Sequence, residues 1–172
     1  QISVLFGMVV DDFNNDGYMD ILAQGNFYNT EIEITRHDAG TGILLLNNGK
    51  GKFSPERSIS SGFRNDGDAK GMATILVGAN NQPVYLLGNS DGNMLSYGLT
   101  SVVKTIPLNE SDAFAMVTLK NGEVRRQELQ AGSGYLSQSA KFIRVSDLVS
   151  SVEVTSYNGQ TRTVYPGQTA SK

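Results

Sequence analysis

The side chains of this chain that are best suited to chemistry are the oxygen-bearing residues of one short polar loop. Asp12, Asn14, Asp16 and Asp20 occupy positions 1, 3, 5 and 9 of this loop, and Gly17 is at position 6. Oxygen side chains on alternate residues of a tight loop suit a hard cation such as calcium, and glycine permits the sharp turn. Without a cation, carboxylates so close together repel one another. The spacing therefore predicts a calcium site.

Tyr18, at position 7, is predicted to add its backbone carbonyl oxygen, with water completing the shell. An EF-hand would need a bidentate Glu at position 12 and a helix on each side. Position 12 is Ala23, and short apolar runs with branched residues flank the loop at 4–10 and 21–25. These runs predict strand–loop–strand, which disfavours an EF-hand or a dockerin-like loop. A polar hairpin turn that holds no ion is the alternative.

The composition limits the class of protein. The chain has 172 residues, with 18% charged residues and a net charge of -3, so there is no basic footprint for nucleic acid or a membrane surface. The absence of cysteine excludes disulfides, thiolate zinc sites and cysteine nucleophiles. The sequence has no apolar run long enough for membrane insertion. It contains 19 glycines, mostly in turn-like dipeptides, which predicts an all-β fold.

The loop has a diverged copy 54 residues further along the chain. At that offset Asp66 and Asp68 take the first two ligand positions, Lys70 takes the third and Thr74 takes the last. An ammonium in the third position should not allow calcium to bind well. The Lys70 ammonium is predicted either to lie among Asp66 and Asp68 in place of the ion or to point into solvent.

The repeat continues, because residues 45–51 resemble residues 86–92. The first copy carries extra polar residues at 29–41, an excursion whose length is typical of a functional loop or of a small added hairpin. Each copy is predicted to form strand, loop, strand, turn and strand, at about 1–57 and 58–107. Such units are typical of propeller blades, of which a closed ring needs about 4–8. Two blades predict a partial propeller, or sheets that are capped in another way.

The last third is also predicted to be β. Residues 113–119 and 124–129 are predicted to form one hairpin, and residues 152–155 and 161–165 a second one across Asn158-Gly159. A turn signal at 107–110 separates this part from the repeats. We therefore expect a β-sandwich-like domain at 108–172, after a repeat domain at 1–107.

These motifs resemble known families. Residues 10–22 and 45–53 resemble the FG-GAP/VCBS repeat, a calcium-loop repeat that is also found in integrin-like propellers. The run Gly132-Ser133-Gly134-Tyr135-Leu136-Ser137-Gln138-Ser139, with 152–159, resembles the ASPIC/UnbV domain that often follows such repeats. Two features depart from that domain: Phe142–Val145 is a partial match, and Ser156 stands where the family has Trp. The resemblance implies a calcium-binding extracellular module.

No residue pattern indicates catalysis. His37 is the only histidine and stands between Arg36 and Asp38, which is typical of a solvated loop. Ser133, Ser137 and Ser139 lie in a Gly/Ser-rich turn without the nucleophile-elbow pattern.

We therefore expect a calcium-stabilised, non-catalytic binding or adhesion module of a secreted or cell-surface protein. Its partners would be a protein or glycan ligand, and the remaining propeller blades of a longer parent chain. The chain begins at Gln1 rather than Met, so its signal sequence is expected to lie outside it. Two alternatives remain: an accessory, carbohydrate-binding domain of a larger extracellular enzyme, and a purely structural domain.

Overall fold

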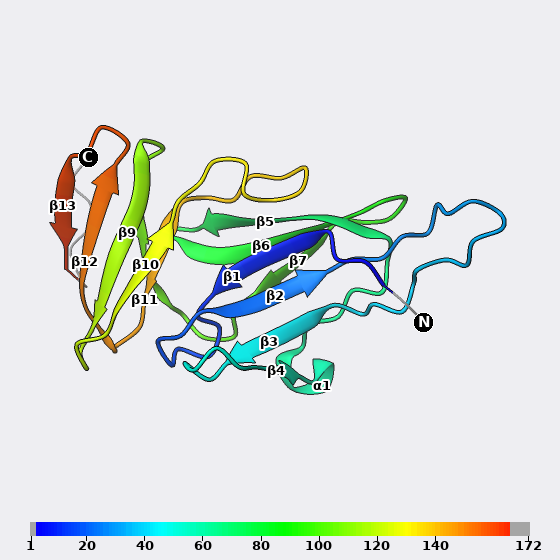
Figure 1. Ribbon diagram of the computed structural model, residues 1–172, viewed down its shortest axis with the longest axis horizontal. Helices are drawn as coiled ribbons and strands as arrows, with labels where there is room; N and C mark the ends of the chain where they lie inside the picture. Colours follow the sequence, from blue (N-terminus) through cyan, green and yellow to red (C-terminus); the bar gives the residue numbers. More distant parts are fainter. Residues whose placement is uncertain (1–2, 166–172) are drawn as a thin grey trace.

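The computed structural model describes residues 3–165; residues 1–2 and 166–172, at the ends of the two predicted domains, lie outside the description. The described residues form 13 strands and one short helix, and the strands are arranged in four antiparallel sheets. The prediction of an all-β fold is confirmed (Figure 1). No helix within residues 3–165 is long and apolar enough to cross a membrane.

The first sheet is an antiparallel meander that carries the predicted calcium loop. Its strand order is β1-β2-β3-β4. The loop joins β1 to β2, and Asn15 and Gly17 turn the chain there with positive φ angles of 61° and 93°. The predicted strand–loop–strand arrangement is therefore present. The four strands are β1 (Gly7–Asp11), β2 (Asp20–Gln24), β3 (Ile43–Asn47) and β4 (Phe53–Glu56).

The second sheet has three strands, in the order β5-β6-β7, and follows the short helix α1 (Ser58–Ser61). The strands are β5 (Ala69–Val77), β6 (Gln82–Asn89) and β7 (Leu95–Gly98). In place of a hairpin loop, residues 66–68 lead directly into β5, and residues 69–74 already belong to that strand. The predicted diverged copy of the loop, with Lys70 at its third ligand position, is therefore largely part of a strand and does not form a loop like the first one.

Strand pairing also corrects the alignment of the two repeats. Leu44 and Tyr85 correspond at an offset of 41 residues, and they pair with Leu22 and Thr74 respectively. Thr74 thus occupies the position of Leu22, not that of the proposed ligand Asp20. A shift of two residues preserves the side-chain face, because successive side chains on a strand alternate between the two faces.

The two repeat sheets pack through equivalent faces. Val9, Leu22 and Leu44 of the first sheet share one apolar cluster with Tyr85 and Leu87 of the second. When two units pack through equivalent faces, both of these faces are used, and no third unit can be added through them. A propeller ring instead requires each unit to use one face for the previous unit and the opposite face for the next. Within residues 3–165 no propeller is formed, and the predicted partial propeller is replaced by this closed pair of sheets.

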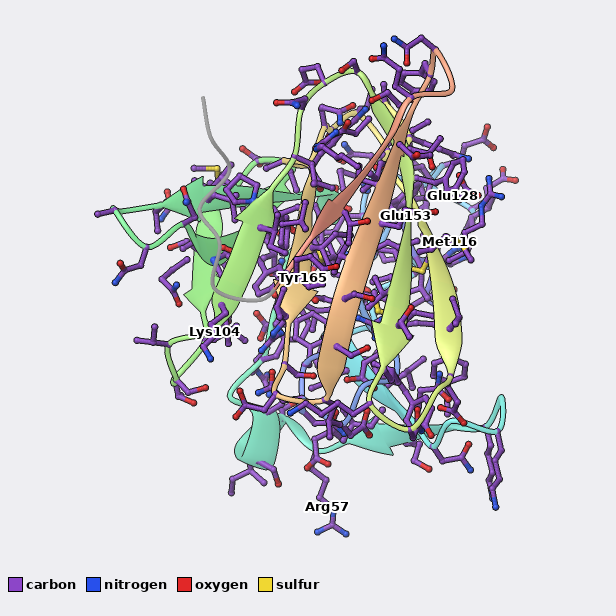
Figure 2. All side chains as sticks on the ribbon, turned by 90° about the vertical axis from the view of Figure 1, so that its left-hand side faces the viewer. Arg57, Lys104, Met116, Glu128, Glu153 and Tyr165 are labelled. Carbon is purple, nitrogen blue, oxygen red and sulfur yellow. The ribbon has the colours of Figure 1, made fainter. Side chains whose placement is uncertain are left out.

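The remaining strands form two sheets that enclose a second core. A sheet of order β10-β9-β12-β13 packs against the pair β11-β8, and Ile106, Val117, Ile143 and Val152 are buried between them. Both predicted hairpins are present. Figure 2 looks onto the larger sheet, on whose outer face Met116 and Glu153 are paired. The strands are β8 (Lys104–Pro107), β9 (Asp112–Leu119), β10 (Val124–Glu128), β11 (Phe142–Val145), β12 (Val149–Ser156) and β13 (Thr161–Val164).

The predicted excursion at 29–41 is a long loop that extends beyond the end of the first sheet (Figure 1). It contains turns and no strand, and one isolated bridge between Phe27 and His37 closes its base. The alternative of a small added hairpin is thus reduced to a single bridge.

A buried ion pair at the start of β9 makes stability sensitive to acid. Both carboxylate oxygens of Asp112, which is fully buried, accept hydrogen bonds from the Arg162 guanidinium at 2.7 and 2.6 Å. Chiefly this interaction, with the Asn109 amide and the Ser156 hydroxyl, lowers the pKa of Asp112. A carboxyl whose pKa is depressed by folding stabilises the protein above its unfolded pKa of about 3.9 and loses that contribution as the pH falls further.

We expect the difference in unfolding free energy between the wild type and Asp112→Asn to be constant near neutral pH and to shrink below about pH 4. Urea unfolding of both proteins across that range measures it. A difference that stays constant down to pH 2 would contradict the role of the ion pair.

Candidate metal site

The two ends of the polar loop are anchored by buried carboxylates. Asp12, which follows β1, accepts hydrogen bonds from the backbone amides of Asp16 and Gly17, both at 3.0 Å. Asp20, the first residue of β2, accepts from the amides of Phe13 and Asn47, both at 2.8 Å. The side chains of the two aspartates are therefore fixed by the turn that they flank.

The middle of the loop holds the other predicted ligands. The Asp16 carboxylate accepts from the Tyr18 amide at 2.9 Å and from the Asn14 side-chain amide at 2.8 Å. Asn14 is exposed, and Asp16 and Tyr18 are half-buried. All five predicted ligands thus lie in one compact turn, with Asn14 toward solvent.

The aspartate carboxylates of the loop carry negative charge that is partly removed from water. Burial raises the pKa of Asp12, against the lowering effects of the Gly17 amide and of Arg125 and Arg144. Burial likewise raises the pKa of Asp20, and the nearby Asp16 raises the pKa of both. Within residues 3–165, none of these three carboxylates forms a salt bridge. Their ionised forms therefore remain incompletely compensated.

The donor set fits a hard cation, although its members do not form a ready-made cage. Three carboxylates, an amide oxygen and a backbone carbonyl are ligands of the kind that calcium prefers. Each ionised carboxylate oxygen has a further lone pair beyond the hydrogen bond that it accepts. In the part of the chain that the structure describes, no three Asp, Glu, His or Cys side chains converge as a metal cluster.

A buried polar network beside the loop was not predicted from the sequence. Asp11, at the end of β1, accepts from the Tyr85 hydroxyl at 2.7 Å and from Arg144 at 3.4 Å. Asp11 and Arg144 are both at least 95% buried. The signal that could have found this pair is the arginine within the otherwise apolar strand Phe142–Val145, because a buried charge requires a partner.

The loop also contacts the larger C-terminal sheet. The Gly17 carbonyl accepts from the Arg125 guanidinium, and the Tyr18 hydroxyl lies 3.4 Å from Glu123. A Cβ atom at Gly17 would lie 3.2 Å from Leu119 and 3.5 Å from Leu148. The predicted metal loop is thus the contact between the first sheet and the hairpin β9–β10.

Gly17→Ala is expected to destabilise the protein by about 2 kcal/mol, through its positive φ and the crowding against Leu119. Gly122→Ala is the matched control, because Gly122 has a similar φ of 88° but no atom of the described residues within 4 Å of an added Cβ. Urea unfolding should give a smaller loss for the control, about 1 kcal/mol. Equal losses would show that the contact with Leu119 contributes nothing.

Lys70, the predicted substitute for an ion, binds only one of its two expected partners. Its ammonium forms a salt bridge with Asp68 and donates to the Asn26 carbonyl at 2.8 Å. It also lies 4.5 and 5.0 Å from the ring centroids of Phe6 and Phe27.

Asp66 instead pairs with Arg64 at 3.0 Å, at an exposed position. Lys70 therefore does not point into solvent, and it does not lie between two carboxylates. It connects the start of β5 to Asn26, which lies just after the end of β2.

The other residues considered for catalysis are the histidine and the serines of the Gly/Ser-rich run. His37 is half-buried, and its Nδ1 is enclosed without a hydrogen-bond partner from residues 3–165. Ser139 accepts from the Thr74 amide at 3.0 Å, and Ser137 donates to the Met72 carbonyl at 2.8 Å. The Gly/Ser-rich run that resembles the ASPIC/UnbV marker thus lies along the free edge of β5.

Comparison with known proteins adds no assignment: no family model and no curated protein matches this chain.

Proposed function

We propose that this chain is a calcium-stabilised, non-catalytic binding or adhesion module of a secreted or cell-surface protein. The observation that supports the proposal is the pair of buried aspartates, Asp12 and Asp20, at the two ends of one loop. Both have a raised pKa, both are near Asp16, and none of the three has an ion-pair partner within residues 3–165. A divalent cation would supply the missing positive charge.

The loop residues would divide the work of holding the ion. Asp12, Asp16 and Asp20 would supply carboxylate oxygens, Asn14 its amide oxygen and Tyr18 its backbone carbonyl, as oxygen-ligand calcium sites require. Bound calcium would neutralise the loop and hold it in one conformation. Because the loop contacts Leu119 and Arg125, the ordered loop would also fix the C-terminal sheet against the first sheet.

The proposal also includes a longer parent chain that supplies further blades. Since the inner faces of the two repeat sheets are already paired, additional sheets would have to cover the outer faces. There Ile75 and Val77 of β5 are both 38% exposed. A parent chain that supplies such sheets would bury these residues.

Calcium is expected to raise the melting temperature of the protein. Extracellular sites bind calcium with a Kd of about 10⁻⁴–10⁻³ M, so millimolar calcium should stabilise the fold by about 1 kcal/mol. For a chain of this length that corresponds to about 2–4 °C. Thermal unfolding in calcium and in chelator measures the shift.

Asp16→Ala should abolish the shift, because it removes the carboxylate that lies beside both buried aspartates. Asp147→Asn is the matched control, since Asp147 is exposed and, among the described residues, pairs only with Lys104 at the surface. If the wild type melts at the same temperature in calcium and in chelator, the proposed metal site is wrong.

A further inference from the structure

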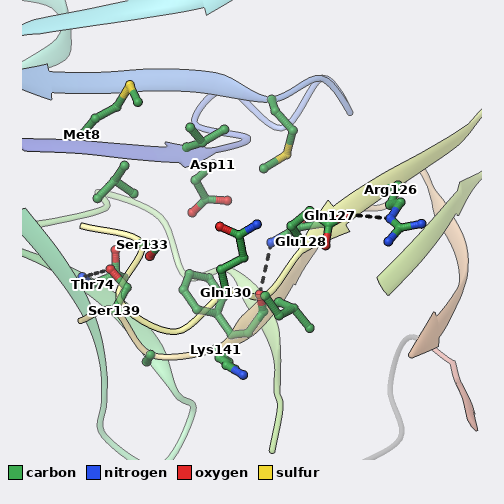
Figure 3. A pocket seen from close by; sticks show the side chains of 16 residues that line it. Met8, Asp11, Thr74, Arg126, Gln127, Glu128, Gln130, Ser133, Ser139 and Lys141 are labelled. Carbon is green, nitrogen blue, oxygen red and sulfur yellow. Dashed lines mark hydrogen bonds and ion pairs between the residues drawn. The ribbon is translucent and has the colours of Figure 1, made fainter. Parts of the chain in front are cut away.

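A cleft of about 410 Å³ lies between the first sheet and the C-terminal sheet, and Figure 3 shows its lining. Its walls are β1, β10 and the segment that leads from β10 to β11. Asp11 and Gln130 point toward one another across it. The volume is within the usual range for a ligand site, about 300–1,000 Å³.

The walls of the cleft are strand edges rather than sheet faces. Residues 8–11 of β1 and residues 126–128 of β10 all line it in succession. On a sheet face only every second residue would do so, because side chains alternate. Within residues 3–165, β1 is paired only with β2, and β10 only with β9. Each strand therefore turns an unpaired row of backbone N–H and C=O groups toward the cleft.

The chain itself shows how such an edge is covered. Along β5, Ala140 donates to the Thr74 carbonyl at 2.7 Å, and Ser139 accepts from the Thr74 amide. An irregular, extended segment thus occupies the edge of β5 at one side of the same cleft. Among the described residues, no segment is hydrogen-bonded along the edge of β1 in this way, although β5 packs beside its first residue, where a Cβ on Gly7 would lie 2.9 Å from Met72.

The charges of the cleft are already engaged. Asp11 pairs with Arg144, and Arg126 with Glu128 at 2.6 Å. The Lys141 ammonium donates to two backbone carbonyls, at 2.7 and 2.9 Å. Because no charge in the lining lacks a partner, a charged ligand would be desolvated there without compensation. The exposed parts of Met8 and Val10 instead offer apolar contact.

We propose that this cleft binds an extended, uncharged segment of a partner polypeptide, which adds to the free edge of β1 as a further strand. Backbone hydrogen bonds would supply affinity, and apolar side chains on alternate residues would contact Met8 and Val10. The inference rests on the proposed binding function and specifies its ligand class as polypeptide rather than glycan. Asp11 ends β1 and Asp12 begins the polar loop, so the loop would hold this edge in place.

The test uses a displayed library of random short peptides, selected on the whole chain in calcium. We expect selected peptides to carry uncharged residues with alternating apolar side chains. Val10→Lys places a charge in the cleft and should weaken their binding at least about tenfold. Val102→Lys is the matched control, because Val102 is exposed and lies outside the cleft. This variant should bind the peptides as the wild type does.

Amide hydrogen exchange on the wild type provides a readout that does not depend on a variant. Bound peptide should slow exchange at alternate residues of β1. No enrichment of peptides, equal binding to Val10→Lys, protection at another edge, or self-association that occupies the cleft would each overturn the inference. If calcium did not raise the melting temperature but the peptides still bound, the metal proposal alone would be overturned.

Discussion

Replacing Arg144 with methionine is expected to lower the free energy of unfolding by about 3–5 kcal/mol. Arg144 is 3% exposed and is the only cationic partner of Asp11 within residues 3–165. Its removal leaves a buried carboxylate whose remaining donors, among the residues that the structure describes, are the Tyr85 hydroxyl and the Asp12 amide. Small domains are stable by about 5–15 kcal/mol, so this loss is a large fraction of the total.

Arg126→Met is the matched control for this experiment. Arg126 is in an exposed ion pair with Glu128, and such pairs contribute about 0–1 kcal/mol. Asp11→Asn in the Arg144→Met background should recover part of the loss, because it removes the buried charge. Urea unfolding of the four proteins measures these differences. Similar losses for the two arginine variants would contradict the role assigned to the Asp11–Arg144 pair.

Gly25→Ala is expected to destabilise the protein by about 3 kcal/mol. Gly25 follows β2, and an added Cβ would lie 1.7 Å from the backbone carbonyl oxygen of Val4. A backbone atom cannot rotate away as a side chain can, so the segment 4–6 would have to leave β2. That movement would also displace Phe6 from the Lys70 ammonium.

Gly98→Ala provides the comparison for Gly25→Ala. Gly98 is exposed at the end of β7, and in the part of the chain that the structure describes no atom lies within 4 Å of an added Cβ. Alanine in a strand is favoured over glycine by about 0.5–1 kcal/mol, so this variant should be neutral or slightly more stable. Chemical unfolding separates the two outcomes. A neutral Gly25→Ala would show that residues 4–6 do not pack on β2 as described.

The local features of this fold were predictable because they depend on short-range patterns. Apolar runs on both sides of a polar, glycine-containing turn predict β1 and β2. The Asn158-Gly159 pair predicts the last hairpin for the same reason, since tight hairpin turns need a residue that accepts positive φ. Gly159 has a φ of 83°.

The register of the second repeat was not predictable from the recurrence of acids and glycines. Asp66, Asp68 and Gly71 recur at the spacing of the first loop, yet Ala69 already begins β5. Acidic and glycine residues mark a turn without fixing the residue at which the next strand begins. The offset that aligned the loops was therefore two residues away from the offset that aligns the strands.

Long-range partners were the other feature that the sequence could not supply. Arg125 and Arg144 approach the polar loop from strands more than 100 residues away, and this pairing depends on how the sheets pack. The same holds for the equivalent faces of the repeats: alternation identifies which side chains are buried but not which sheet covers them. Hence the loop residues were identified in advance, whereas the cationic network beside them was not.

Calcium titration of the chelator-treated protein, followed by the backbone amide resonances, tests the central claim most directly. The account predicts that the amide signals of residues 12–20 shift together, with a Kd of about 10⁻⁴–10⁻³ M. Asp147→Asn should give the same titration, and Asp16→Ala should give none. If the amide signals of residues 12–20 stay unchanged up to a large calcium excess, or shift equally in Asp16→Ala, the loop is a polar turn and not a calcium site.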